Sequence, residues 1–321
     1  MSGKLRKERQ SKSMNQKKAL VTGGAGFIGS NVVDLLLKKG WHVTVVDNLS
    51  TGFITNLDLK NENLEFWELD ILSEEFDLHW SHDFAKFNKV FHLAALPRVE
   101  PSIRDPLTSN KQNVDATLKI FENARKSGVT DIVFSSSSSV YGDAENVPTG
   151  ETEPVNPMSP YALQKLICDQ YAKLYCDLYD MNITCLRYFN VYGRHEPVAG
   201  AYVPVVGIWL RQQGEGSPLT ITGDGEQSRD FVNVSDVAAV NLGCAEVSLR
   251  GFNVFNVGSG KTHSLNYLAS LISDNTTYIS QRFEPKYTCA DISKLEKQVG
   301  WVPKHTIESY LSDKKKSLKN E

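Results

Sequence analysis

The chain has 321 residues, of which 40% are hydrophobic and 23% charged, and its formal net charge is −3. That balance argues against a nucleic-acid-binding protein, which would show a basic excess, and no apolar run reaches the roughly 18 residues that a membrane-spanning helix needs. Five cysteines without Cys-x-x-Cys spacing are expected to be reduced thiols, as in a cytoplasmic protein, rather than disulfides or zinc ligands.

Residues 1–16 carry five lysines and arginines and almost nothing that could be buried. They lack the apolar core of a secretory signal. We therefore expect a disordered basic tail and a cytoplasmic location, and we favour this interpretation over a tail that binds nucleic acid or membranes.

From Lys17 onward, short apolar strands alternate with helical patterns. Helices are predicted over residues 27–39, 106–127 and 160–179. The predicted strands cover residues 19–22, 42–47, 64–69, 89–93, 131–135 and 182–188. This alternation predicts an α/β fold with a doubly wound parallel sheet of the Rossmann type.

The rhythm changes after Tyr188, where glycines, prolines and short extended pieces dominate to about Arg229. Residues 230–257 are predicted to form a helix and one more strand that returns to the sheet. The sequence thus predicts a nucleotide-binding domain from 17–188 and 229–257. A smaller C-terminal substrate-binding lobe would come from 189–228 and 258–321.

A glycine motif, Gly24-x-Gly26-x-x-Gly29, lies between the first strand and the first helix. Its glycines allow a tight turn and a close approach of pyrophosphate, and the helix N-terminus offers free N–H groups to the phosphates. The predicted cofactor contacts in this turn are Gly23, Gly26, Phe27, Ile28 and Gly29.

A carboxylate, Asp47, ends the second strand 18 residues after Gly29. A carboxylate at this place accepts hydrogen bonds from ribose hydroxyls and repels a 2′-phosphate. Because Asn48 follows and no arginine is adjacent, NAD is favoured over NADP. Asp70 and Ile71, after the third strand, are plausible contacts to the adenine, although Asp70 as an ordinary loop residue is nearly as well supported.

The strand at 131–135 runs into five consecutive serines, 135–139. Hydroxyls at the C-terminal end of a parallel strand face the crevice where ligands bind. The next helix begins with Ser159 as a candidate N-cap and Pro160 at its first position. Tyr161 and Lys165 then share one face of this helix. An ammonium beside a phenol favours the phenolate, so the pair can supply a proton acceptor.

The segments GGAGFIGS, DNLSTG, HLAA, SSSSSVYG, YALQK and RYFNVYG, in this order and spacing, resemble the extended short-chain dehydrogenases/reductases. Within that family, the chain looks most like the nucleotide-sugar 4-epimerases. The resemblance covers residues 17 to about 304. It implies bound NAD, a UDP-sugar substrate and a homodimer paired through the 106–127 and 160–180 helices.

The resemblance also implies roles for individual residues. Tyr161 would be the base, Lys165 its partner and a ligand of the nicotinamide ribose, and Ser137 a hydrogen-bond partner of the reacting hydroxyl. The further cofactor contacts implied are Asn48 and Ala94. The substrate contacts implied are Ser137, Ser138, Ser139, Asn190, Thr220, Arg229, Arg282 and Thr288. For Arg229, an ion pair with Asp230 is the alternative, and at Arg282 the Gly-Asp that usually follows in the family is replaced by Phe283-Glu284.

Two serines bear on the reaction. Related 4,6-dehydratases place an Asp-Glu pair, and UDP-glucuronate decarboxylases usually a Glu, where this chain has Ser138 and Ser139. Neither serine can act as a carboxylic acid, which favours oxidation and re-reduction at C4 of the sugar. Tyr161 would then take the 4-hydroxyl proton while NAD accepts the hydride.

The choice of sugar stays open. Thr288 stands where UDP-glucose-restricted relatives carry a bulky Tyr, which favours UDP-GlcNAc/UDP-GalNAc, with UDP-Glc/UDP-Gal also possible. Arg98 could bind a carboxylate, so a UDP-glucuronate 4-epimerase or decarboxylase is the alternative, although a salt bridge from Arg98 to Glu100 is equally plausible. A non-catalytic NAD-binding sensor is the remote alternative. No metal site is expected, because His79, His82 and His195-Glu196 form no metal-ligand pattern.

Overall fold

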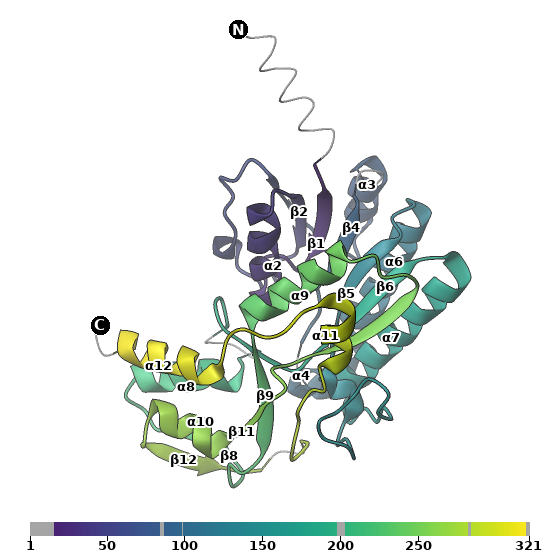
Figure 1. The fold of residues 1–321 in the computed structure, drawn as a ribbon. Helices are drawn as coiled ribbons and strands as arrows, with labels where there is room; N and C mark the ends of the chain where they lie inside the picture. The colour runs from purple at the N-terminus through teal and green to yellow at the C-terminus, as the bar shows by residue number, and fades with distance from the viewer. Residues whose placement is uncertain (1–15, 84–86, 98, 198–202, 282–283, 319–321) are drawn as a thin grey trace.

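The computed structural model describes residues 16–83, 87–97, 99–197, 203–281 and 284–318 (Figure 1). Three parts of the sequence-based prediction, namely the basic tail up to residue 15, Arg98 and Arg282, lie outside these residues.

A seven-stranded parallel sheet in the order β10-β6-β5-β4-β1-β2-β3 organises the larger part of the molecule. The strands are β1 (Lys18–Thr22), β2 (His42–Asp47), β3 (Leu64–Glu68), β4 (Lys89–His92), β5 (Asp131–Ser137), β6 (Asn182–Tyr188) and β10 (Phe252–Val257). The chain winds outward from β1 to β3, then crosses to β4 and continues in the other direction. The predicted doubly wound α/β fold is thus confirmed, with its switch point between β1 and β4, where such sheets bind ligands.

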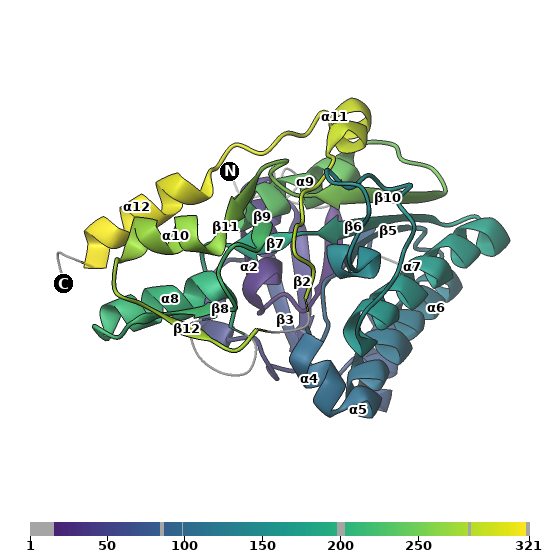
Figure 2. The same cartoon turned by 90° about the horizontal axis from the view of Figure 1, so that it is seen from below.

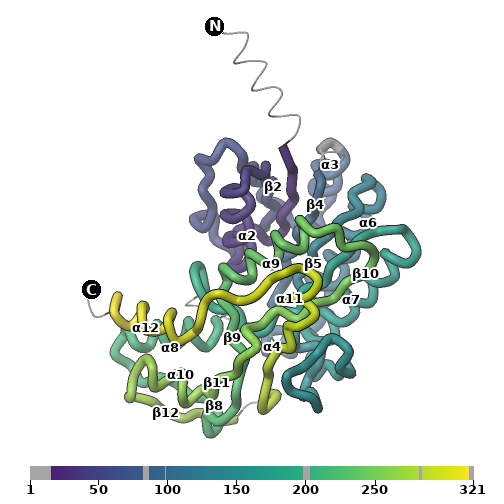
Figure 3. The backbone as a smooth tube through the Cα atoms, in the orientation of Figure 1, coloured from purple at the N-terminus to yellow at the C-terminus, as the bar shows by residue number. Residues whose placement is uncertain are grey.

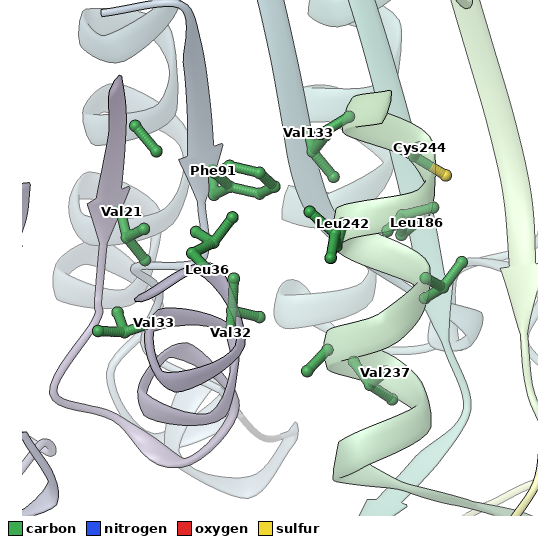
Figure 4. Packing of buried hydrophobic residues seen from close by; sticks show 14 of the residues in the cluster. Val21, Val32, Val33, Leu36, Phe91, Val133, Leu186, Val237, Leu242 and Cys244 are labelled. Atoms are coloured by element: carbon green, nitrogen blue, oxygen red, sulfur yellow. The ribbon is translucent and has the colours of Figure 1, made fainter. Parts of the chain in front are cut away.

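Both faces of this sheet are covered by helices (Figure 2). One face carries α2 (Phe27–Lys38) and α9 (Val234–Glu246), whose apolar residues pack with Val21 and Val45 (Figure 4). The opposite face carries α3 (Glu74–Asp83), α6 (Ala116–Lys126) and α7 (Pro160–Tyr179), which pack with Leu20 and Val46. Neighbouring strand residues thus point to opposite cores, which explains why these strands read as continuous apolar runs.

The predicted helix at 106–127 is interrupted. The structure has α5 (Pro106–Asn110), a π-helical turn at Lys111–Asp115 and then α6. The apolar pattern alone could not reveal the π turn, because it accompanies side-chain bonds from Asn113 to residues distant in the sequence. The serine strand is also longer than predicted, since Ser135–Ser137 pair with Leu186–Tyr188 of β6.

Beyond β6, short strands build two small sheets. One has the order β11-β9-β7, formed by Thr262–Ser264, Ser228–Asn233 and Asn190–Tyr192, and the other pairs β12 (Thr276–Ile279) with β8 (Leu219–Thr222). A separate apolar cluster joins these sheets to α8 (Val205–Gly214), α10 (Leu265–Ile272) and α12 (Ile307–Leu318). The tube in Figure 3 shows the C-terminal segment passing α11 (Ser293–Val299), beside β10, before it reaches α12. The predicted domain boundaries stay a prediction.

Two predictions from composition can be compared with the structure. All five cysteines are buried and free. Within the described part of the chain, no helix combines the length and apolar character needed to cross a membrane.

Candidate active site

A cleft of about 730 Å³ opens at the C-terminal ends of the central strands and extends to the small sheets. It brings together almost all the residues singled out from the sequence. The predicted residues on its lining are Gly23, Gly26, Phe27, Ile28, Gly29, Asp47, Asn48, Asp70, Ile71, Ala94, Ser137, Ser138, Ser139, Tyr161, Lys165, Asn190, Arg229 and Thr288.

The glycine turn between β1 and α2 leaves no room for side chains. A Cβ atom added at Gly29 would lie 2.0 Å from the carbonyl oxygen of Gly23. One added at Gly23, which has φ +67°, would lie 2.7 Å from the backbone nitrogen of Ala94. Gly26 is the N-cap of α2 and makes no side-chain cap bond, so the first N–H groups of the helix are not capped by a side chain. The turn therefore fits a pyrophosphate.

Asp47 stands beside this turn at the end of β2. Its Oδ2 accepts a hydrogen bond from the Ala25 amide at 3.0 Å, and its Oδ1 accepts one from the Leu49 amide at 2.9 Å. Burial raises the pKa of Asp47 above its usual value, and the two amide bonds partly offset this. The side-chain amide of Asn48 donates to the Asp70 carboxylate at 3.2 Å, and this bond joins the loops after β2 and β3. These residues fit the adenosine half of NAD.

The Tyr161–Lys165 pair lies at the start of α7, as predicted. Ser159 caps the helix by accepting a bond from the Ala162 amide, and Pro160 occupies its first turn. Lys165 is 3% exposed. Its Nζ donates to the Ser135 carbonyl at 2.7 Å and lies 6.0 Å from the centroid of the Tyr161 ring. The ammonium is thus fixed between the serine strand and the tyrosine.

Ser137 caps the 3₁₀ turn formed by Ser138–Tyr141. Its hydroxyl oxygen accepts bonds from the Ser139 amide at 3.2 Å and from the Ser139 hydroxyl at 2.9 Å. Two accepted bonds use both lone pairs of a hydroxyl oxygen. With both of these bonds accepted, the Ser137 proton is free to be donated to an acceptor in the cleft.

The predicted substrate residues at the other end of the cleft have partners within the chain. Asn190 donates its side-chain amide to the Asp230 carbonyl at 2.9 Å. Arg229 pairs with Glu284 at 3.1 Å, so the alternative ion pair with Asp230 is wrong. Asp230 instead accepts bonds from Ser259, Gly260 and Ala290, which hold two loops together. The Thr288 hydroxyl is buried without a hydrogen-bond partner in the described structure.

Thr220 is the exception among the described residues. It does not line the cleft. Its amide donates to the Gln212 side chain at 3.0 Å, and its hydroxyl accepts from the same side chain at 3.1 Å. The Thr220 side chain is thus bonded to Gln212 of α8, and the geometry does not support Thr220 as a substrate contact.

A buried ion pair beneath the serine turn was not predicted. Arg187 of β6 donates from Nε to Asp169 at 3.0 Å and from Nη1 to the Tyr141 hydroxyl at 2.8 Å. Tyr141 in turn donates to Asn256 at 2.7 Å. Arg187 thus ties α7 to the turn that carries Ser137. The signal in the sequence was an arginine in a strand that has no other charged residue.

His92, at the end of β4, was also missed. It is fully buried between the hydroxyls of Thr22, at 2.6 Å, and Thr117, at 2.9 Å. Burial, together with the charge of Lys165, lowers the pKa of His92 from 6.5 to about 3. His92 therefore stays neutral in the folded protein and links β1 to α6 behind the glycine turn.

This histidine predicts a pH dependence of stability. Between about pH 3 and 6.5 the unfolded chain binds a proton at His92 that the folded chain excludes. The free energy of unfolding should therefore rise with pH across this range, His92 contributing up to about 1.4 kcal/mol per pH unit. Urea denaturation at several pH values gives the free energy of unfolding as a function of pH. For His92→Gln this free energy should rise less steeply between about pH 3 and 6.5, by the equivalent of about one bound proton. Equal slopes for the two proteins would contradict the assignment.

Comparisons with known proteins agree with this geometry. The model of the NAD dependent epimerase/dehydratase family matches residues 19–258. The chain belongs to this family. A putative UDP-glucose 4-epimerase of Methanocaldococcus jannaschii is 38% identical over 293 residues, which cover 88% of this chain and 92% of that protein. A UDP-glucuronate 4-epimerase of Thermodesulfobacterium geofontis is 33% identical, with 91% and 93% covered.

One solved structure is similar to this protein over nearly the whole chain. UDP-N-acetylglucosamine 4-epimerase from Methanobrevibacter ruminantium M1, in complex with UDP-N-acetylmuramic acid, has a TM-score of 0.88 and 37% identity. The match covers 95% of this chain and 99% of that one. Membership of the family and the fit of the glycine turn together identify NAD as the cofactor of this epimerase/dehydratase fold.

Proposed function

We propose that this member of the family is an NAD-dependent epimerase that inverts C4 of a UDP-sugar through a transient 4-keto sugar. The observation that carries the proposal is the meeting of Tyr161, Lys165 and Ser137 in one cleft with the glycine turn. The relatives named as 4-epimerases support it.

Each residue has a definite task in this reaction. Tyr161 takes the proton of the 4-hydroxyl and later returns one. Lys165, held by the Ser135 carbonyl, places its side-chain nitrogen beside Tyr161. Ser137 donates a hydrogen bond to the oxygen on C4 as it becomes a carbonyl. Held by the glycine turn and Asp47, NAD would supply the acceptor for the hydride of C4 and the source of its return.

The serine turn favours epimerisation over elimination or decarboxylation. Ser138 and Ser139 line the cleft where dehydratases and decarboxylases resembling this chain carry acids. Among the described residues, the carboxylates on the lining are Asp47, Asp70 and Glu284. Asp47 ends β2, Asp70 lies in the loop after β3, and Glu284 is paired with Arg229. None belongs to the serine turn or to α7, where a general acid would be needed beside the sugar.

At the far end of the cleft, we propose that Arg229 and Asn190 contact the diphosphate. The Arg229 side chain is 11% exposed. Its Nη1 donates to the backbone carbonyls of Ser228 and Lys286, which fix the guanidinium. A fixed guanidinium fork suits phosphate oxygens. During turnover, the 4-keto sugar would turn about this diphosphate anchor and present its opposite face for re-reduction.

For the sugar, we propose UDP-GlcNAc/UDP-GalNAc, with activity on UDP-Glc/UDP-Gal as a second substrate pair. Thr288 lines the cleft with a small side chain, which leaves room for an acetamide. The glucuronate alternative rests on Arg98, which lies outside the described residues, and on the relative from Thermodesulfobacterium geofontis.

The test is to incubate the purified protein separately with UDP-GlcNAc, UDP-Glc and UDP-GlcA, without added NAD, and to resolve the products by NMR. We expect the C4 epimer of UDP-GlcNAc. A keto-deoxy product or a pentose would redirect the assignment to a dehydratase or a decarboxylase. If no C4 epimer forms from any of the three sugars, even after NAD is added, the proposed epimerase activity is wrong.

A homodimer is part of the proposal. Three leucines of α7, Leu163, Leu174 and Leu178, are exposed at 47%, 49% and 66%, and Leu107 of α5 is 83% exposed. In Figure 2, α5, α6 and α7 lie together at one side of the molecule. We propose that a second copy of the chain covers this apolar face.

The dimer gives a direct prediction. Leu174→Glu combined with Leu178→Glu should place charges on the covered face and convert the dimer to a monomer, as measured by light scattering after size exclusion. Leu59→Glu, at a residue that is 54% exposed in another part of the molecule, is the matched control and should leave the dimer intact. A wild-type monomer would contradict this part of the proposal.

A further inference from the structure

A buried network of polar side chains connects the loop after β4 to the helix that carries Tyr161 and Lys165. The side chain of Asn113 accepts a bond from the Leu96 amide at 2.7 Å and donates to the Leu96 carbonyl at 3.1 Å. It also donates to Oε1 of Gln164 at 2.8 Å. Ser109 donates its hydroxyl to the same oxygen at 2.8 Å.

The direction of every bond in this network follows from the backbone of Leu96. Its N–H must donate, so Asn113 has to present its oxygen there, and its carbonyl must accept, so Asn113 presents its NH₂ group beside it. The remaining proton of that NH₂ group is donated mainly to Gln164, at 2.8 Å, with the Ser109 hydroxyl oxygen as a longer second acceptor at 3.4 Å, so Gln164 presents its oxygen. The amides of Asn113 and Gln164 have one possible orientation.

The network is shielded from water. Asn113, Gln164 and Ser109 are 2%, 3% and 4% exposed. The π-helical turn at Lys111–Asp115 carries Asn113, and such turns inside helices are frequent at functional sites. A buried polar network fixes one arrangement when every member is satisfied and is costly when one partner is lost.

The position of the anchored loop links this network to the substrate. β4 lies between β1, which leads to the glycine turn, and β5, which leads to the serines. Leu96 and Pro97 follow β4 and line the cleft. After the loop comes α4 (Val99–Arg104), whose Ser102 accepts a bond from the Tyr161 amide at 3.1 Å. Leu96 and Pro97 therefore form part of the wall of the same cleft into which Tyr161 and Ser137 face.

We infer that Gln164 is a positioning residue that sets the space for the hexose. Through its bond to Asn113, Gln164 holds the part of the cleft wall formed by Leu96 and Pro97 at a fixed separation from Tyr161 and Lys165. The uridine diphosphate would be held at the far end of the cleft, where Gln164 has no contact. Pro97 has no N–H, so it cannot add a backbone donor to hold this wall. The inference rests on the proposed function for the identity of the ligand.

The test compares a UDP-sugar with UDP alone. Gln164→Met keeps the approximate volume but leaves Asn113 and Ser109 without their acceptor. The dissociation constant of UDP-GlcNAc, measured by calorimetry, should rise at least about fivefold, the effect of one lost net hydrogen bond. The constant for UDP and the NAD content should change less than about twofold. In kinetics, KM for UDP-GlcNAc should rise and kcat should fall.

Two variants control for general loosening. Ser109→Ala keeps the bond between Asn113 and Gln164 and should bind UDP-GlcNAc within about twofold of the wild type. Gln298→Met, at an exposed position of α11, should change nothing. The inference is overturned if Gln164→Met binds UDP-GlcNAc as the wild type does, or if it weakens UDP and UDP-GlcNAc equally. If the wild type does not epimerise UDP-GlcNAc, the proposed function is contradicted instead. The two outcomes can be told apart because the ratio of the dissociation constants for UDP-GlcNAc and UDP is measured without turnover.

Discussion

Tyr161→Phe is expected to reduce epimerisation by at least about a hundredfold while the purified protein keeps its NAD. The change removes one hydroxyl and leaves the ring, so the packing at the start of α7 is retained. General acid–base catalysis by a positioned group typically contributes about 10²–10⁴-fold, and no other described residue on the lining is placed to replace this one. The measurement is kcat by NMR of the sugar C4 epimer, with NAD determined in an acid extract.

Tyr171→Phe, on the same helix, is the matched control and should retain wild-type activity, since Tyr171 does not line the cleft. A Tyr161→Phe protein within about tenfold of the wild type would exclude Tyr161 as the group that moves the proton.

Gly29→Ala is expected to remove NAD from the purified protein and to lower the free energy of unfolding by about 1–3 kcal/mol, as overpacking does. The new Cβ would lie 2.0 Å from the Gly23 carbonyl oxygen and 2.8 Å from Gly24, both of them backbone atoms that cannot turn aside. The helix α2 would have to move away from β1, and the turn that binds pyrophosphate would open. NAD content and urea denaturation measure the two effects.

Gly150→Ala adds the same methyl group at a place where the nearest atom, Oδ2 of Asp291, is 3.9 Å away. It should leave both NAD content and stability close to those of the wild type. Full NAD occupancy in Gly29→Ala would show that close packing of this turn is not what the cofactor requires.

Local chemistry explains why much of the site could be predicted. The glycine turn, Asp47 and the start of α7 depend on residues close together in the sequence, and each lies where the pattern placed it. The central strands are buried on both faces, so their apolar runs were visible without any knowledge of their partners. The serine run became informative because it continues one of these strands.

Long-range contacts explain what could not be predicted. The π turn depends on Asn113 meeting Leu96 and Gln164, which lie 17 and 51 residues away. The partner of Arg229 is Glu284, from a loop that the sequence gives no reason to place there. Thr220 was predicted from the resemblance alone, and its bonds to Gln212 depend on how α8 packs against β8. Strands of three to six residues in the small sheets gave no periodic signal.

The central claim is that C4 loses and regains the same hydrogen while Tyr161 handles only the proton of the hydroxyl. The most direct measurement is NMR of the product from UDP-GlcNAc deuterated at C4, converted in ordinary water by the protein as purified. We predict that the C4 epimer keeps its deuterium. Loss of the deuterium to solvent would contradict the account, because it would mean that C4 is inverted by removal of a proton from carbon.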